Sequence, residues 1–273
     1  MDTVIQGTDE KKQLIPGMRV VITQAPDQYP ELSEQLRGLG AEVLFYPCVE
    51  IMPISDNQEL ESALREAASG KFDWIVLNYA ETVVVLANQM REMDLDPRHL
   101  DNLKVATIGC MTELVTQRLL GLQADFAPEN YTPQIVAEAM QLNVGDRVLL
   151  PQSARTRLRL ARCLRETGAD VTAVNSYRAI IGHGGDPVPV MLWEGSIDAI
   201  TFTSPEDVRY FSRRLKHEGG SLAMLDDVCV ACLGPITAAT AVEYGLKVSV
   251  QPAQHTIQGL VDATSAYFTL ASK

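Results

Sequence analysis

Residues 231–237 have the sequence Ala231-Cys232-Leu233-Gly234-Pro235-Ile236-Thr237, and residues 106–112 have the sequence Ala106-Thr107-Ile108-Gly109-Cys110-Met111-Thr112, 125 positions earlier. In both stretches a short apolar run stops at glycine, and a helical pattern follows that ends at a second glycine, Gly121 or Gly245. Passages from strand to helix with this punctuation are typical of parallel α/β sheets. We therefore interpret the chain as a duplicated α/β unit.

Other segments repeat in the same order. Residues 72–75 and 197–200 each carry an aspartate before a short apolar strand, again 125 positions apart. A second set has an offset of 128 and lies outside the first: residues 19–22 match 147–150, and residues 39–43 match 167–171. One such match is expected by chance, but an ordered set is not. Along the chain, a first half-unit is followed by a second half-unit, and both then occur again in the same order.

Each unit alternates short runs rich in Val and Ile with amphipathic stretches, which is the pattern of βαβ units. Helix starts agree with this interpretation, because Ser204-Pro205 and Thr132-Pro133 each supply an N-cap hydroxyl followed by proline. We expect an α/β fold with two similar doubly wound parallel-sheet domains.

Two long apolar segments follow Val43 and Val171, and both are longer than one short strand needs. They suit a pair of extended linkers that carry the chain to a second domain and back. Two consecutive domains remain an alternative at this point. Gly182-His183-Gly184-Gly185 resembles an oxyanion loop but lacks a nucleophile, and we expect it to be a flexible linker.

Composition narrows the function. A chain of 273 residues with 46% hydrophobic residues can bury a sizeable core, and a net charge of -12 argues against a non-specific nucleic-acid binder. The N-terminal residues lack the apolar centre of a signal peptide, and no stretch is long enough to span a bilayer. We expect a cytoplasmic protein with no membrane partner.

The five cysteines predict reduced thiols rather than disulfides. Cys229 and Cys232 form a C-x-x-C pattern inside an apolar strand, where positions three apart face opposite ways. The four histidines share no ligand spacing. We therefore expect no metal site.

Candidate binding residues gather where predicted strands run into helices. In parallel sheets these carboxyl ends are where ligands bind, and exposed helix amides there attract anions. Ser204, Gly109 and Gly234 end three predicted strands, and helices are expected to begin near Thr112 and Thr237. Plain helix capping explains each hydroxyl taken alone, so the case for binding depends on their shared location.

A further predicted strand, 148–150, is followed by Ser153 and Arg155, which together suit a carboxylate; a capped helix with solvated arginines is the simpler alternative. The phosphate-binding G-x-G-x-x-G and G-x-x-x-x-G-K-[ST] patterns and the G-x-S-x-G nucleophile elbow are all absent. Nucleotide, hydride and acyl chemistry are therefore disfavoured.

The sequence resembles the uroporphyrinogen-III synthase family from about Arg19 to Ala266. Five stretches carry the resemblance: residues 39–43, Val174-Asn175-Ser176-Tyr177-Arg178, residues 200–205, residues 234–238 and residues 256–261. Their order and spacing together are specific, although each stretch alone is weak.

The resemblance implies interleaved domains that face one another across a cleft. The expected boundaries are a tail at 1–15, a discontinuous first domain of 16–46 plus 183–273, a second domain of 52–173, and linkers at about 47–51 and 174–182. It also implies that no metal or organic cofactor is needed. Nothing in the sequence demands more than a monomer, which is the state we expect.

The implied reaction is the cyclisation of hydroxymethylbilane, a linear tetrapyrrole that hydroxymethylbilane synthase would hand over, with inversion of the last ring and loss of water. Tyr177 matches the family tyrosine proposed to help the hydroxyl leave. The other implied positions bind substrate: Thr23, Asn78, Gly109, Thr112, Ser153, Arg155, Thr203, Ser204, Gly234, Pro235, Ile236 and Thr237.

The chain departs from the family pattern at three places. Asn78-Tyr79 stands where a Thr-Ser pair is usual, Cys110 replaces a common proline, and Gln24 replaces a common arginine. These changes keep a second hypothesis open, a non-catalytic paralogue that binds a tetrapyrrole or another polyanion. A two-domain solute-binding protein is a third, which the missing signal peptide disfavours.

Overall fold

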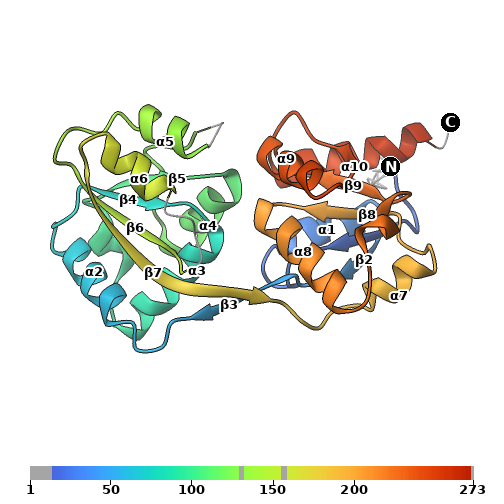
Figure 1. Ribbon diagram of the computed structural model, residues 1–273, viewed down its shortest axis with the longest axis horizontal. Coiled ribbons are helices and arrows are strands. Elements are labelled where there is room, and N and C mark those ends of the chain that lie inside the picture. Colours follow the sequence, from blue (N-terminus) through green and yellow to red (C-terminus); the bar gives the residue numbers. More distant parts are fainter. Residues whose placement is uncertain (1–13, 129–131, 155–158, 272–273) are drawn as a thin grey trace, which may run out of the picture. The chain divides into compact units, whose positions relative to one another are not determined.

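The structure is a computed structural model that describes residues 14–128, 132–154 and 159–271 (Figure 1). The chain divides into two compact units. Unit 1 contains the residues up to Glu50 and those from Ile181 onward, and unit 2 contains Ile51–Ile180. Most of the expected tail, residues 1–13, lies outside the described residues. Ile15, in contrast, is fully buried and donates its N–H to the carbonyl of Leu39.

Unit 1 is a five-stranded parallel sheet in the order β10-β9-β8-β1-β2. The first strand of the chain pairs with β8 in the register Val20↔Ala199, so the N-terminal residues and the C-terminal third share one sheet. This pairing excludes consecutive domains. The strands are β1 (Arg19–Ile22), β2 (Glu42–Phe45), β8 (Ala199–Phe202), β9 (Cys229–Cys232) and β10 (Val248–Val250). The helices are α1 (Pro30–Gly38), α7 (Val188–Trp193), α8 (Pro205–His217), 3-10 helix η2 (Leu222–Leu225), α9 (Pro235–Glu243) and α10 (Ile257–Ala271).

Unit 2 contains the second five-stranded sheet, in the order β3-β7-β6-β4-β5. Strands β7, β6, β4 and β5 are parallel to one another. The strands are β3 (Val49–Pro53), β4 (Trp74–Leu77), β5 (Lys104–Thr107), β6 (Arg147–Ser153) and β7 (Asp170–Ile181). The helices are α2 (Gln58–Ala68), α3 (Ala80–Glu92), 3-10 helix η1 (Pro97–Leu100), α4 (Cys110–Leu120), α5 (Pro133–Ala139) and α6 (Arg159–Glu166).

Buried residues on both faces of the strands explain the doubly wound form. In unit 2, Val76 and Val148 belong to a cluster with Val136 of α5 and Leu164 of α6. Ile75, one position along, is fully buried as well and points to the opposite face, because successive strand residues alternate. Helices flank each sheet (Figure 1). The predicted fold class is confirmed. No helix in the described ranges is long and apolar enough to cross a membrane.

The segments that cross between the units are held close together on the side of unit 1. Gly182 donates its N–H to the Cys48 carbonyl at 2.8 Å, and a Cβ at Gly182 would collide with the backbone of Pro47. Gly185 has φ +79°, and a Cβ there would collide with the Phe45 carbonyl. We expected glycines at residues 182–185 because a linker is flexible. Gly182 and Gly185 instead permit two segments of the chain to pack closely.

Arg214 of α8 fastens both crossing segments to unit 1. Its guanidinium is buried and donates to the Pro47 carbonyl at 2.5 Å and to the Gly184 carbonyl at 2.7 Å. Glu218 accepts from Arg214 at 2.8 Å and from the Tyr46 hydroxyl at 2.7 Å. The guanidinium also lies 3.8 Å from the centre of the Tyr46 ring. Arg214 is buried whereas Glu218 is partly exposed, and all three guanidinium nitrogens of Arg214 have an acceptor, as burial of charge requires.

The two repeats share one hydrogen bond at the amino ends of their sheets, in which an aspartate accepts the backbone N–H of an arginine. Asp198 accepts the Arg19 backbone N–H at 2.7 Å, and Asp73 accepts that of Arg147 at 2.9 Å. The guanidinium groups differ. Arg147 returns to Asp73 with Nε at 3.0 Å and Nη2 at 2.8 Å, whereas Arg19 turns to Glu42 at 3.1 Å. The charge of Asp73 is therefore compensated by its own repeat, and that of Asp198 is not.

Candidate functional site

The carboxyl edge of the sheet in unit 1 collects seven of the expected binding residues. Adjacent strands β9, β8 and β1 end immediately before Leu233, Thr203 and Thr23, and α8 and α9 begin at the same edge. Helix α9 starts slightly earlier than predicted, with Gly234 as its N-cap and proline at its first position. The seven residues are Thr23, Thr203, Ser204, Gly234, Pro235, Ile236 and Thr237.

A buried carboxylate, Asp207, organises this edge. Its Oδ2 atom accepts from the backbone N–H groups of Thr203 at 3.0 Å and Ser204 at 2.8 Å, and from the Thr203 hydroxyl at 3.0 Å. Gln24 Nε2 donates to the same atom at 2.6 Å. Ser204 in turn accepts the Asp207 N–H at 3.2 Å, which completes a capping box. The loop between β8 and α8 is thereby held in one conformation.

Two opposing effects act on the Asp207 carboxyl. Burial raises its pKa, and the hydrogen bonds from Ser204 and Thr203 lower it. The same network includes one departure from the family pattern. Gln24 supplies an uncharged donor to Asp207 at 2.6 Å and to the Thr203 hydroxyl at 2.9 Å. The positions of Gln24 and Thr203 are thus coupled.

The carboxyl edge of unit 2 gathers the remaining described candidates. Strands β7, β6, β4 and β5 are neighbours. Ser153, Asn78 and Gly109 lie at or just beyond the carboxyl ends of β6, β4 and β5, and Tyr177 lies within β7 where its pairing with β6 stops. Gly109 is the N-cap of α4 with φ +89°, a conformation that favours glycine. Thr112, in the first turn of α4, is buried and donates its hydroxyl to the Ile108 carbonyl at 2.9 Å. That hydroxyl therefore stabilises the helix start.

Three buried polar atoms at this edge have no hydrogen-bond partner among the described residues. They are Asn78 Oδ1, directly after β4, Thr107 Oγ1, at the end of β5, and Thr82 Oγ1, in the first turn of α3. Buried polar atoms are normally paired, and unpaired ones cost free energy unless water or a ligand meets them. This edge of unit 2 therefore offers polar atoms to water or to a ligand.

Tyr177 lies opposite Ser153 in the sheet, because β6 and β7 pair in the register Ser153↔Tyr177 after a shift between Gln152 and Ser153. The Ala154 N–H donates to the Tyr177 carbonyl at 2.8 Å, which holds this end of β7. Tyr177 is only 3% exposed. Arg155, the remaining predicted contact, lies outside the described residues.

Sequence reasoning missed Asp207, Thr82 and Thr107. Asp207 had a signal, since Ser204 followed three residues later by an acid is the pattern of a capping box. Thr107 lies inside a repeated stretch but looks like an ordinary strand residue. Thr82 carries no local signal, because its importance depends on which strand ends lie beside it.

Fold and edges together define a class: a duplicated, doubly wound α/β protein with interleaved units. Each unit presents hydroxyls, amides and helix N-termini at the carboxyl edge of its sheet, groups that suit an anionic ligand. Residues 30–262 match the protein family described as uroporphyrinogen-III synthase HemD. The chain belongs to this family of cyclising lyases of porphyrin synthesis.

Similar proteins carry consistent names. The chain is 29% identical over 255 residues to the porphyrin biosynthesis protein HemD of Ruminiclostridium josui, which covers 92% of this chain and 49% of that relative. The chain therefore spans about half the length of that protein. It is 28% identical over 259 residues to the uroporphyrinogen-III synthase of Synechococcus elongatus, covering 92% of this chain and 95% of the relative.

Solved structures agree in fold. A variant of the uroporphyrinogen III synthase of the extremely thermophilic bacterium Thermus thermophilus matches with a TM-score of 0.63 at 18% identity, covering 94% of this chain and 100% of that one. The enzyme of Helicobacter pylori matches with a TM-score of 0.50 at 12% identity, with coverage of 94% and 100%. At these identities the likeness establishes the fold alone.

Proposed function

We propose that this chain is a uroporphyrinogen-III synthase that cyclises hydroxymethylbilane, with inversion of ring D and loss of water, to uroporphyrinogen III. The observation that carries the proposal is membership of the family over residues 30–262. The two carboxyl edges support it, because they offer neutral donors to a substrate with eight carboxylates. Such donors bind anions even in a chain with a net charge of -12.

The edge of unit 1 offers carboxylates of the substrate a surface that is organised by hydrogen bonds within the unit. Asp207 and the capping box hold Ser204 in place, and the N-termini of α8 and α9 contribute the positive ends of their dipoles. Ser204, Gly234 and Thr237 then hold carboxylates of the bilane. Thr203 contributes through its position, since its hydroxyl and N–H are both engaged with Asp207.

The edge of unit 2 binds the substrate through groups that lack partners. Asn78 Oδ1 is an acceptor, so it suits a pyrrole N–H better than a carboxylate, while the Thr82 and Thr107 hydroxyls can donate or accept. The expected contacts at Gly109, Thr112 and Ser153 surround this place in the same sheet. Orientation of the bilane by such contacts favours attack at the substituted ring carbon over direct closure.

Tyr177 assists departure of the hydroxyl in this proposal. The phenol donates its proton to the leaving oxygen as the carbon–oxygen bond breaks, water departs, and the pyrrole nitrogen supplies the electron pair that stabilises the resulting cation. Because Tyr177 is 3% exposed, neighbouring segments of unit 2 must move for the substrate to reach it. Binding is therefore coupled to a local rearrangement at the end of β7.

The test supplies purified protein with freshly generated hydroxymethylbilane, oxidises the products and separates the type I and type III isomers by chromatography. Predominant type III product supports the proposal. Type I at the spontaneous rate would refute catalysis.

The role of Tyr177 is tested in the same assay. For Tyr177→Phe we expect type III formation to fall about 10²-fold or more, the usual scale of a lost proton donor. Tyr244→Phe, on α9's C-cap in unit 1, is the matched control and should leave the rate unchanged. A folded Tyr177→Phe variant with full turnover would exclude proton donation by this residue.

A second candidate is the non-catalytic paralogue that binds a tetrapyrrole. The unpaired Asn78 Oδ1, at a position that departs from the family pattern, favours it, because a hydroxyl there is missing. This candidate predicts saturable binding of uroporphyrinogen without acceleration of type III formation. The Asn78→Thr variant separates the two, since restored activity would identify Asn78 as the cause of the loss.

We also propose that the protein acts in the cytoplasm as a monomer and receives its substrate from hydroxymethylbilane synthase. Transfer prevents loss of a reactive intermediate to spontaneous closure. In a coupled reaction the fraction of type III product should then stay constant when a scavenger of free bilane is added. Size-exclusion chromatography with light scattering measures the oligomeric state.

A further inference from the structure

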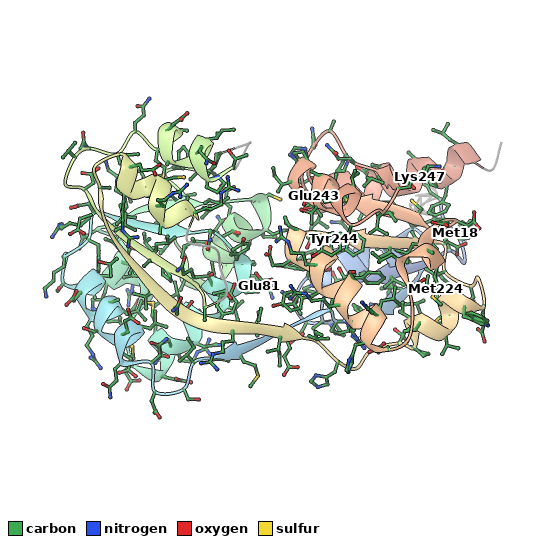
Figure 2. All side chains as sticks on the ribbon, in the orientation of Figure 1. Met18, Glu81, Met224, Glu243, Tyr244 and Lys247 are labelled. Atoms are coloured by element: carbon green, nitrogen blue, oxygen red, sulfur yellow. The ribbon has the colours of Figure 1, made fainter. Side chains whose placement is uncertain are left out.

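A pocket of about 410 Å³ lies in unit 1 at the amino ends of β8 and β9, the edge opposite the proposed substrate residues. This volume falls within the usual range of ligand sites. Met224 of η2 lines it, and Figure 2 shows Met224 on the same side of the unit as Met18, which directly precedes β1. The pocket also takes residues from the end of α7 and from α10.

Aromatic side chains form one wall of this pocket. Trp193, at the end of α7, is 80% exposed, an unusual state for so large an apolar residue. Tyr267 and Phe268 of α10 pack edge to face with their ring centres 5.3 Å apart. The apolar surface continues beyond the pocket through Val190 and Leu270, which are 56% and 72% exposed. Each lies three residues from a lining aromatic on its helix, and so on the same face.

Two carboxylates also line the pocket. Asp198 and Asp227 line the pocket, and no lysine or arginine is found among the described residues that do. Asp227 makes no side-chain hydrogen bond or ion pair within the described part of the chain. Asp198, over the same residues, binds only the backbone N–H of Arg19, through Oδ2.

The sister repeat shows what Asp198 lacks. Asp73 occupies the same place in unit 2, and the guanidinium of Arg147 binds both of its oxygens. In unit 1 the equivalent guanidinium, that of Arg19, is engaged by Glu42 instead. The pocket therefore presents the Asp198 carboxylate, which the guanidinium of Arg19 does not bind, beside exposed aromatic rings.

We propose that this pocket binds an arginine or lysine side chain presented by an apolar segment of a partner protein. Aromatic faces and carboxylates together attract a cation, and the stem of a long basic side chain packs against the rings. A protein is the occupant because exposed Val190 and Leu270 extend the apolar surface past the pocket, as in an interface with an aromatic and arginine centre.

The site is separate from the proposed chemistry. Strand β8 has four residues, which at ~3.3 Å per residue places its two ends roughly 10 Å apart, with Asp198 before one end and Ser204 beyond the other. An occupant at the amino edge therefore does not displace a substrate at the carboxyl edge. The inference does not depend on the proposed function.

The experiment titrates the full chain, labelled with nitrogen-15, with the peptide acetyl-Leu-Arg-Leu-amide. The protein has two tryptophans, so their indole N–H signals report separately on Trp193 and on buried Trp74, which is the internal control. We expect the Trp193 signal to shift saturably and the Trp74 signal to stay. The same peptide with citrulline in place of arginine should bind at least tenfold more weakly.

Variants of two neighbouring aspartates test which carboxylate contacts the basic side chain of the peptide. Asp227→Asn should weaken peptide binding several-fold, whereas Asp226→Asn, which removes the same charge one residue outside the pocket lining, should not. Trp193→Ala should abolish binding as followed by calorimetry. Equal binding of the two peptides, an unshifted Trp193 signal, or equal effects of the two aspartate variants would each overturn the proposal. Formation of the type III isomer should be unchanged by saturating peptide.

Discussion

The carboxyl edges of the two units share a backbone plan but differ in how their polar groups are satisfied. In unit 1, Asp207 collects donors from Gln24, Thr203 and Ser204, although Gln24 Oε1 and Glu206 Oε2 have no partner in the described residues. In unit 2, Asn78, Thr82 and Thr107 each leave a buried oxygen without a partner in the described residues. Duplication therefore preserved the fold while the hydrogen bonding at the two edges diverged: in unit 1 it centres on a buried carboxylate, and in the described part of unit 2 it leaves three buried oxygens unpaired.

The strongest test of this difference is Asp207→Ala. It removes the common acceptor of four hydrogen bonds, and the backbone N–H groups of Thr203 and Ser204 lose their partner in a buried place. We expect a loss of roughly 3 kcal/mol in the free energy of unfolding, measured by urea denaturation. Asp226→Asn, at an exposed site in the same unit, should change it little. A small loss for Asp207→Ala would show that unit 1 is not organised around this carboxylate.

A smaller effect is expected from Ser204→Ala, which removes the N-cap of α8. Such caps contribute about 1 kcal/mol, and Asp207 continues to hold the loop from the other side of the capping box. Thermal denaturation measures the change. Ser221→Ala is the matched control, because Ser221 precedes η2 without a capping hydrogen bond. Equal shifts in the two variants would mean that the capping box adds no stability.

The amino edge of unit 2 adds a prediction about how the stability of the fold depends on pH. Arg147 lowers the pKa of Asp73 from 3.8 to about 2 by hydrogen bonding. A carboxyl whose pKa is lower in the folded state stabilises the fold above pH 3.8, and this contribution is lost as the pH falls toward 2. The pair is largely exposed, so screening by solvent keeps the contribution below that of the Ser204 cap. Asp73→Asn should flatten the profile of stability against pH over this range, as measured by urea denaturation.

The smallest change is expected from Thr107→Val in unit 2. Its hydroxyl has no partner to lose, and valine has nearly the same shape, so stability should stay within about 0.5 kcal/mol of the parent or rise. Thr201→Val in unit 1 is the matched variant, because the Thr201 hydroxyl donates to the Val21 carbonyl at 3.2 Å and should lose about 1 kcal/mol. Equal losses would contradict the contrast between the two edges.

Much of the fold was predictable because each repeated stretch and each helix cap is a pattern of residues that lie close together in the sequence. Ser204-Pro205 caps α8 as expected, and Gly121 ends α4 in the left-handed conformation. The extent of the strands was less predictable. Residues 174–177, expected in a linker, remain paired to β6, since an apolar extended segment gives no sign of where its partner strand ends.

The candidate site was predictable in position but not in detail. Strand ends and the helices that follow them located Ser204, Gly234, Gly109 and Ser153, because parallel strands bring their carboxyl ends to one edge. Which hydroxyls are free and which are engaged was not apparent. Thr203 and Thr112 both use their hydroxyls within the unit.

The sequence by itself determined the duplicated α/β plan, the strand-to-helix punctuation and the family, because these depend on residue types at short spacing and on their repetition. Tertiary structure alone decided which side chains meet. Gln24 reaches Asp207 across 183 positions of sequence, and Arg214 reaches the Pro47 carbonyl across 167. The different partners of Arg19 and Arg147 were decided in the same way. Contacts between residues so far apart depend on the whole chain packing at once, and no local pattern records them.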